Sequence, residues 1–218
     1  MMHYAFKHKT DFMKAIQNAV ARGYTRYCSG STTAKKALVM AYKFEDRGYG
    51  ISMTTQQKWR AKKAGKATST LISLAVGEKV SWFLLVTAGE GIVEQVENLR
   101  DAKSKKERIE FTGYELVVQP RPKDKAAWTW RMTEATKNEW AERIGHAVRV
   151  RNDDSEIRQC LWSLARVPGF AQSRRDAFKL FRDMQGDYKR IKRSEWPYKG
   201  LWVAFHGRFK AGEKIPLG

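Results

Sequence analysis

The chain has 218 residues, of which 42 are Lys or Arg and 23 are Asp or Glu, so its formal net charge at pH 7 is +19. Hydrophobic residues make up 42% and aromatic residues 12% of the sequence, which excludes a disordered polycation and predicts a sizeable core. A compact fold with this positive excess repels itself, which indicates an anionic partner such as nucleic acid.

A membrane partner and a secreted form are both disfavoured by the sequence. The longest apolar run, Trp82 to Val86, is far shorter than a membrane span of about 20 residues. Residues 1–9 contain no apolar signal-peptide region. The two cysteines, Cys28 and Cys160, have no metal-site spacing, so we expect buried and reduced thiols. These features predict a cytoplasmic protein.

The N-terminal part predicts three helices. Apolar residues at helical spacing indicate a first helix over residues 10–22. Residues 24–28 are expected to form a short strand that leads into a turn at residues 29–31. A second helix is expected over residues 33–47 and a short basic helix over residues 56–63, with Gly residues after each.

The middle of the chain predicts an antiparallel sheet of about five strands. Two runs rich in β-forming residues flank Gly77-Glu78-Lys79, and two more flank Thr112-Gly113, as in hairpins. Trp128 and Trp130 alternate with polar residues, so both indoles should point to one face. The expected strands are residues 68–76, 80–87, 108–111, 114–119 and 127–132. Residues 92–102 suit either a helix or an irregular crossing segment, and residues 120–125 a loop.

From Thr133 onward the apolar spacing is helical. Thr136 and Glu139 are expected to form a capping box, and Asp153 or Asp154 to cap the next helix. A long basic helix is expected over residues 173–194. Its core-facing residues are expected to be Phe178, Phe181, Tyr188 and Ile191. Residues 201–205 suit either a last strand or an apolar clamp.

Together these elements predict an α+β fold with N-terminal helices, a central antiparallel sheet and a helical C-terminal part. We expect residues 1–150 to form an α+β core domain, and residues 151–218 a basic helical part packed on it. Residues 1–60 hold 11 basic and 3 acidic residues, residues 61–150 hold 16 and 12, and residues 151–218 hold 15 and 8. The two ends are therefore the expected contact surfaces.

No motif of a catalytic centre is found. The four histidines, at positions 3, 8, 146 and 206, form no HxH or HExxH pattern, and residues 88–91 lack the Lys-Ser/Thr of a P-loop. The run Ser81–Thr87 has none of the carboxylates that a two-metal site needs. Glu110 and Glu115 lie on expected strands, but Glu115-Leu116-Val117 lacks the lysine of a nuclease motif. We expect no catalytic residue, no metal and no cofactor.

Aromatic residues interleaved with basic ones are the positive signal, because cations neutralise phosphates while exposed rings stack on unpaired bases. For Trp128 and Trp130, burial in the core is favoured. For Trp59, burial in the core and contact with nucleic acid stay equal alternatives. For the basic face of residues 174–193, contact with nucleic acid is favoured. The candidate nucleic-acid-binding residues are Lys58, Trp59, Arg60, Lys62, Lys63, Arg174, Arg175, Arg182, Lys189, Arg190 and Arg193.

Several stretches together resemble a group of basic proteins carried by bacterial plasmids and integrative or conjugative elements. They are Gly23-Tyr24-Thr25-Arg26-Tyr27, Trp82–Thr87, Leu99–Ala102, Gly113–Val117 and Trp128–Thr133. The similarity covers about residues 20–190. It implies a mobile-element setting and carries over no catalytic residue.

The function expected from the sequence is non-catalytic binding of nucleic acid through phosphate contacts, with DNA favoured over RNA. Two alternatives stay open. One is a metal-dependent nuclease whose carboxylates converge only in three dimensions. The other is an RNA-binding subunit of a larger nucleoprotein complex, with protein partners.

Overall fold

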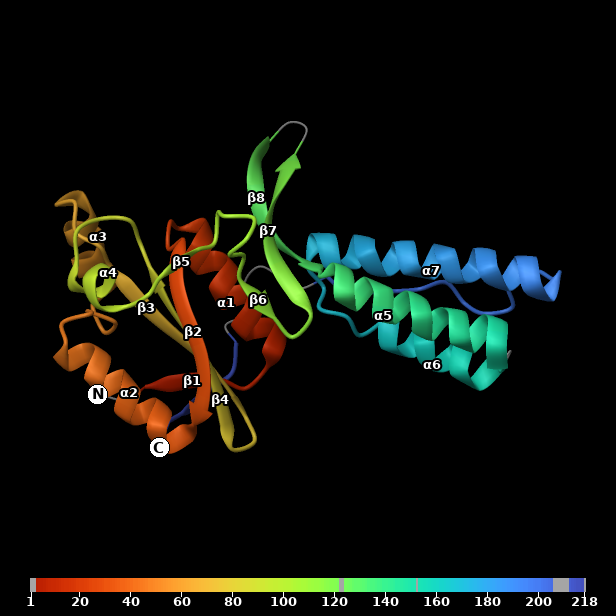
Figure 1. Cartoon of the computed structure of the whole chain (residues 1–218), viewed down its shortest axis with the longest axis horizontal. Coiled ribbons are helices and arrows are strands. Elements are labelled where there is room, and N and C mark those ends of the chain that lie inside the picture. The colour runs from red at the N-terminus through yellow and green to blue at the C-terminus, as the bar shows by residue number, and fades with distance from the viewer. Residues whose placement is uncertain (1–2, 122–123, 152, 206–211, 218) are drawn as a thin grey trace. The chain divides into compact units, whose positions relative to one another are not determined.

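The computed structural model describes residues 3–121, 124–151, 153–205 and 212–217. The chain forms two compact units, which are called unit 1 (residues 1–109 and 209–218) and unit 2 (residues 110–208). Both combine helices with strands (Figure 1), so the expected α+β class is confirmed. The division expected at residue 150 falls inside unit 2.

Unit 1 contains a mixed sheet that is built mainly from antiparallel pairs. Among the described residues, six strands lie in the order β5-β2-β4-β3-β1-β9, and β1 runs parallel to β3. The elements of unit 1 are β1 (Tyr4–Phe6), α1 (Lys9–Ala21), β2 (Arg26–Thr33), α2 (Ala34–Asp46), α3 (Thr55–Lys63), β3 (Ser69–Val76), β4 (Lys79–Val86), α4 (Ile92–Val96), β5 (Arg100–Asp101) and β9 (Lys214–Pro216).

Helices cover both faces of this sheet because its central strand β4 is apolar on both sides. Phe83 packs edge-on against Phe12 of α1, with ring centroids 5.8 Å apart. Its neighbour Leu84 points to the opposite face, where it joins a buried cluster with Phe44 of α2 and with Tyr49. A strand that is buried on both faces reads as a continuous apolar run, as residues 82–86 do.

The strand expected at residues 24–28 is confirmed for residues 26–28, but the turn expected after it is wrong. Residues 29–31 are not a turn, because β2 pairs with β4 along its whole length, from Arg26 opposite Val86 to Thr33 opposite Lys79. Gly30 lies opposite Trp82, and a Cβ atom at position 30 would lie 2.8 Å from the indole. The glycine therefore makes room for a cross-strand indole. The hairpin of β3 and β4 is confirmed, and residues 92–102 form α4 followed by β5.

Unit 2 combines a small antiparallel sheet with a helical part. Among the described residues, β7 lies between β6 and β8. The elements of unit 2 are β6 (Glu110–Phe111), β7 (Tyr114–Arg121), β8 (Asp124–Met132), α5 (Glu134–Gly145), the π-helix η1 (His146–Arg151), α6 (Asp154–Leu164) and α7 (Ala171–Lys192). The loop expected over residues 120–125 is wrong at residues 120, 121, 124 and 125, which belong to β7 and β8. Residues 122 and 123 lie outside the described residues.

Of the two helix caps expected in unit 2, one is confirmed and one is wrong. The capping box at Thr136 is wrong, because α5 begins earlier and the Thr133 hydroxyl accepts the Thr136 N–H at 3.2 Å. Asp153 caps α6 as expected, accepting the Ser155 N–H at 2.8 Å. Residues 201–205 form no strand; instead the buried Val203 accepts a hydrogen bond from Arg174 at 3.0 Å.

The core of unit 2 lies between β8 and α7. Trp130 is fully buried there, as expected, and Trp128 is half-buried. Phe181 and Tyr188 of α7 face the core as expected. The expectation for Ile191 is wrong, because this residue lies in the last turn of α7 and is 37% exposed. No helix in the described part of the chain combines the length and the apolar character needed to cross a membrane.

Candidate nucleic-acid interface

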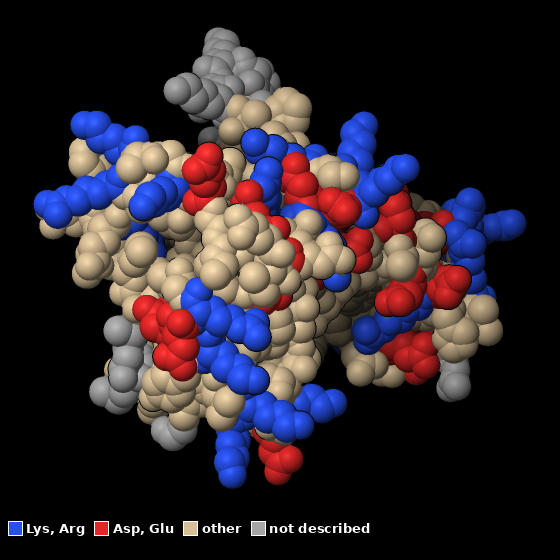
Figure 2. Space-filling model, turned by 60° about the vertical axis from the view of Figure 1, so that its left-hand side comes forward, with Lys and Arg blue, Asp and Glu red and all other residues tan. Residues whose placement is uncertain are grey.

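Basic side chains stand out from the surface at many places, and in several of these Asp or Glu side chains lie close to them (Figure 2). A cation that is already paired with a carboxylate serves the fold first, because a phosphate would have to displace its partner. The contacts of each candidate cation therefore decide whether it is available to a nucleic acid.

Helix α3 forms from local signals. The Thr54 hydroxyl accepts the Gln57 N–H at 3.3 Å, and the Gln57 side chain accepts the Thr54 N–H at 2.8 Å, which completes a capping box. None of the residues of α3, all of them described, is buried. The helix therefore adds little to the core of unit 1 and presents its side chains at the surface.

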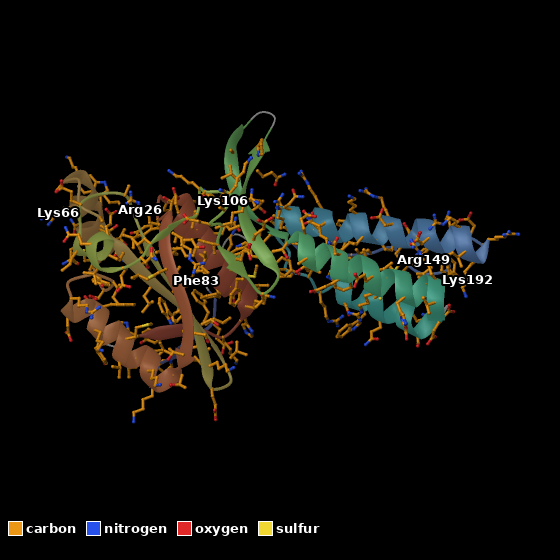
Figure 3. The ribbon with its side chains drawn as sticks, viewed as in Figure 1. Arg26, Lys66, Phe83, Lys106, Arg149 and Lys192 are labelled. Carbon is orange, nitrogen blue, oxygen red and sulfur yellow. The ribbon has the colours of Figure 1, made fainter. Side chains whose placement is uncertain are left out.

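The turn at residues 88–91 holds the C-terminal end of α3 in place. The Glu90 N–H donates to the Gly65 carbonyl at 3.0 Å, and the Glu90 carbonyl accepts the Ala67 N–H at 2.9 Å. Gly89 has a φ of +138°, and a Cβ atom there would lie 2.7 Å from the Ala67 nitrogen. This glycine turn thus fixes the segment that follows α3. Lys66 lies in that segment, at the edge of unit 1 (Figure 3).

The basic residues of α3 fall into two groups. Lys62 lies over the Tyr24 ring at 4.2 Å, and its Nζ donates to the Arg22 carbonyl at 3.5 Å. Lys58 donates to the Ile51 carbonyl at 3.4 Å, and burial lowers its pKa from the ordinary value although the Glu45 charge partly raises it. Lys58 and Lys62 therefore lie against unit 1.

The second group points outward. Arg60 and Lys63 are exposed, and the Lys63 Nζ lies 5.3 Å from the centre of the Trp59 ring. Trp59 is itself 61% exposed, which rules out the core for this residue. An exposed indole among cations has the composition of a stacking site for bases.

A cleft of about 620 Å³ in unit 1 brings part of this set together with residues from other elements. Its walls come from the end of α1, from α3 and β3, and from the paired strands β1 and β9. The described residues that line it include four cations, Arg22, Lys58, Lys62 and Lys214, and four aromatic residues, Tyr4, Phe6, Tyr24 and Trp59, but no Asp or Glu. A wall of cations without carboxylates favours anionic ligands.

The floor of the cleft includes a free strand edge. Strand β1 pairs with β3 only at Phe6 opposite Leu74, so the first half of β3 has no partner strand on that side among the described residues. The Thr87 N–H donates to the Thr68 carbonyl, which sets the hydrogen-bonded pairs of β3 and β4 at residues 70 and 72. The N–H and C=O of Leu71 therefore face the cleft.

The candidate residues of α7 lie in unit 2, and half of them are engaged. Arg174, one of the contact candidates, donates to the Val203 carbonyl and is only partly exposed. Lys189 pairs with Glu195 at 2.5 Å, and Arg190 pairs with Asp187. Asp187 also binds Arg149, which Figure 3 shows near the C-terminal half of α7. The exposed candidates without such contacts in the described residues are Arg175, Arg182 and Arg193.

Sequence reasoning missed most of the cleft. Arg22, Lys214, Tyr4 and Tyr24 were not candidates, because they come from different elements and show no shared local pattern. The Lys58-Trp59-Arg60 stretch was the one local signal of the cleft. The expected reduced thiols are seen as two free cysteines, Cys28 half-buried and Cys160 buried. Burial raises the pKa of Cys28 to about 11.

The carboxylates of the nuclease alternative lie on neighbouring strands of unit 2. Glu110 lies opposite Glu115, and the buried Glu115 accepts a hydrogen bond from the Arg131 Nε at 2.6 Å. Among the described residues, no group of three or more His, Cys, Asp or Glu side chains is placed to hold a metal ion. Glu115 is thus part of a cross-strand ion pair.

No protein-family model, curated protein or solved structure matches the chain. The resemblance to proteins of bacterial mobile elements therefore stays a prediction.

Proposed function

We propose that this protein binds nucleic acid through the cleft of unit 1 and the outward face of α3, without catalysing a reaction on it. The observation that carries the proposal is the lining of the cleft, in which four cations are gathered and no carboxylate is found among the described residues. Cations that neutralise phosphates release the counterions condensed on a nucleic acid, and this release supplies most of the affinity of sequence-independent binding.

The pairing of other cations in unit 1 supports this assignment. Arg26 pairs with Glu94 and Arg47 with Glu97, so these charges already have partners. None of the four cleft cations makes an ion pair with a described residue. Uncompensated charge of one sign in a concave site destabilises the free protein and is relieved by an anionic ligand.

Unit 2 supports a second contact surface on α7, although less strongly. Arg175 and Arg182 are exposed and have no ion pair among the described residues, whereas Arg190 is paired with Asp187. DNA stays the favoured ligand over RNA. The proposal that the protein belongs to a bacterial mobile element rests on the sequence resemblance alone. We also propose that the protein acts in the cytoplasm.

A charge-reversal experiment tests the outward face of α3, beside the cleft. Arg60→Glu with Lys63→Glu should weaken binding of a labelled oligonucleotide by about tenfold or more, measured by fluorescence anisotropy at low salt. The matched control is Lys35→Glu with Lys36→Glu, which makes the same change in net charge on two exposed residues at the start of α2. The control should lose no more than about twofold, because its charges act only at long range.

Two results would overturn the proposal. The first is a wild-type protein that binds neither DNA nor RNA at low salt. The second is an equal loss of affinity in the α3 and α2 variants, both shown to be folded by circular dichroism. Cleavage of DNA or RNA in Mg²⁺ or Mn²⁺ that disappears in Glu115→Gln would instead support the nuclease alternative.

A further inference from the structure

We infer that the cleft of unit 1 takes unpaired nucleotides, with a base stacked on Trp59 and its neighbouring phosphates held by the cleft cations. This inference rests on the proposed function, because it assumes that the ligand is a nucleic acid. It adds that the ligand is single-stranded, which neither the net charge nor the basic residues alone decide.

The first support is the position of Trp59. Its indole is 61% exposed and lies in the wall of the cleft, with the Lys63 ammonium 5.3 Å from the ring centre. The ring is largely exposed, and no residue of α3 is fully buried, so packing in the core does not explain the indole. Stacking of a base on an aromatic ring is tolerant of sequence and is available only to bases that have left a duplex.

The second support is the pairing of cations with rings along the cleft. Lys62 lies 4.2 Å from the centre of the Tyr24 ring, and Lys214 lies 5.0 Å from the centre of the Phe6 ring. Each ring fixes the position of a cation at the wall. Phosphates on both sides of a stacked base would thus find charge already in place, as in other grooves that follow a single strand.

The third support is the free edge of β3. The Leu71 N–H and C=O form a donor and acceptor pair that faces the cleft. The Watson–Crick edge of a base also carries donors and acceptors, but in a duplex these groups are bonded to the other strand. Only an unpaired base can bring this edge to a protein backbone.

The size and shape of the cleft agree with this ligand. Its volume of about 620 Å³ lies within the range of small-ligand pockets, about 300–1,000 Å³, and suits one or two nucleotides. Proteins that read a duplex commonly place a convex helix or ribbon in its groove. An acidic peptide could use the same strand edge, but the edge without a partner strand spans only Ser69 to Ile72, which leaves few main-chain bonds for strand addition.

The test compares four polyanions of equal length by fluorescence anisotropy. They are a DNA strand of about 12 nucleotides, its duplex, an abasic strand with the same phosphates and no bases, and polyglutamate. We expect the DNA strand to bind about tenfold more tightly than the abasic strand, since one stacked base accounts for a factor of this order.

Variants assign the difference to Trp59. Trp59→Leu should lose about tenfold on the DNA strand and little on the abasic strand, and Trp59→Phe should keep most of the affinity because it keeps a ring. The control is Trp162→Leu, which removes an indole that is 58% exposed in unit 2. Thermal melts of all three variants check the fold.

The outcomes separate this inference from the proposed function. Equal binding of the DNA strand, its duplex and the abasic strand, or an unchanged affinity in folded Trp59→Leu, would overturn the stacking site and leave backbone binding in place. Polyglutamate that binds as tightly as the DNA strand would point to an acidic protein segment instead. A wild-type protein that binds none of the nucleic acids would overturn both.

Discussion

The dependence of binding on salt follows from the number of cations in the cleft. If each of the four cleft cations neutralises one phosphate of a single strand, the cleft alone contributes about −3 to the slope of log K against log salt concentration, since each contact contributes about −0.7. Raising the salt concentration from about 50 to about 200 mM should then weaken binding by roughly fiftyfold.

A substitution that neutralises a single cation tests whether that cation contributes to the salt dependence. Arg22 ends α1, its side chain is exposed, and it makes no ion pair within the described residues. Arg22→Gln should therefore leave the free energy of unfolding within about 0.5 kcal/mol of the wild type and reduce the slope by about 0.7. Lys36→Gln on α2 is the control and should leave the slope unchanged.

The assay is an anisotropy titration with a labelled single strand at five salt concentrations, with a thermal melt of each variant. A wild-type slope shallower than about −1 would mean that the cleft does not hold the backbone of the strand. An Arg22→Gln slope equal to that of the wild type would show that Arg22 binds no phosphate and leave three cleft cations in contact with the strand.

Three further predictions concern single residues. Gly30→Val should destabilise unit 1 by about 1–3 kcal/mol in urea unfolding, because the new side chain meets the Trp82 indole. Lys58→Met should raise the thermal midpoint at neutral pH and weaken binding. Burial lowers the pKa of Lys58 in the folded state, so its charge opposes folding fully below that pKa, and the penalty is lost as the pH rises from there to the pKa of the unfolded chain. Asp176→Ala should cost about 1.5–3 kcal/mol in urea unfolding, because the buried Met132 N–H donates to this carboxylate at 2.9 Å.

Each of these has a result that would contradict it. A Gly30→Val variant as stable as the wild type would show that Trp82 has another place to lie. A lower midpoint in Lys58→Met would mean that the hydrogen bond to Ile51 outweighs the burial of the charge. For Asp176, the comparison is Asp176→Asn, which keeps an acceptor; equal losses in both variants would assign the effect to charge rather than to the hydrogen bond.

The parts of the fold that sequence could predict are those with local causes. Helix α3 begins at the Thr54 and Gln57 pair and ends near Gly65, and the hairpin of β3 and β4 is set by its turn. The length of β2 could not be read in the same way, because Gly30 looks like a turn residue until its cross-strand neighbour is known. Pairing with a strand far along the chain decides it.

The residues of the candidate site also divide into those with a local sequence signal and those brought together only by the fold. Lys58, Trp59 and Lys62 were predictable because one short helix carries them. Arg22 and Lys214 line the same cleft from opposite ends of the sequence, so no window of sequence contains both. On α7 the Arg190 and Asp187 pair follows from helical spacing, whereas the part that Arg149 plays depends on tertiary packing.

Because β9 pairs with β1, the sheet of unit 1 can be completed only late in translation. The Leu217 N–H donates to the His3 carbonyl, and Leu217 is buried beside Ala5 in the core of unit 1. All of unit 2 and most of unit 1 are translated between these strands, which at about 5–20 residues per second separates β1 from β9 by roughly 10–40 s. Because β9 also supplies Lys214 to the cleft, a nascent chain on the ribosome acquires its complete wall of cations only after the last strand has been added.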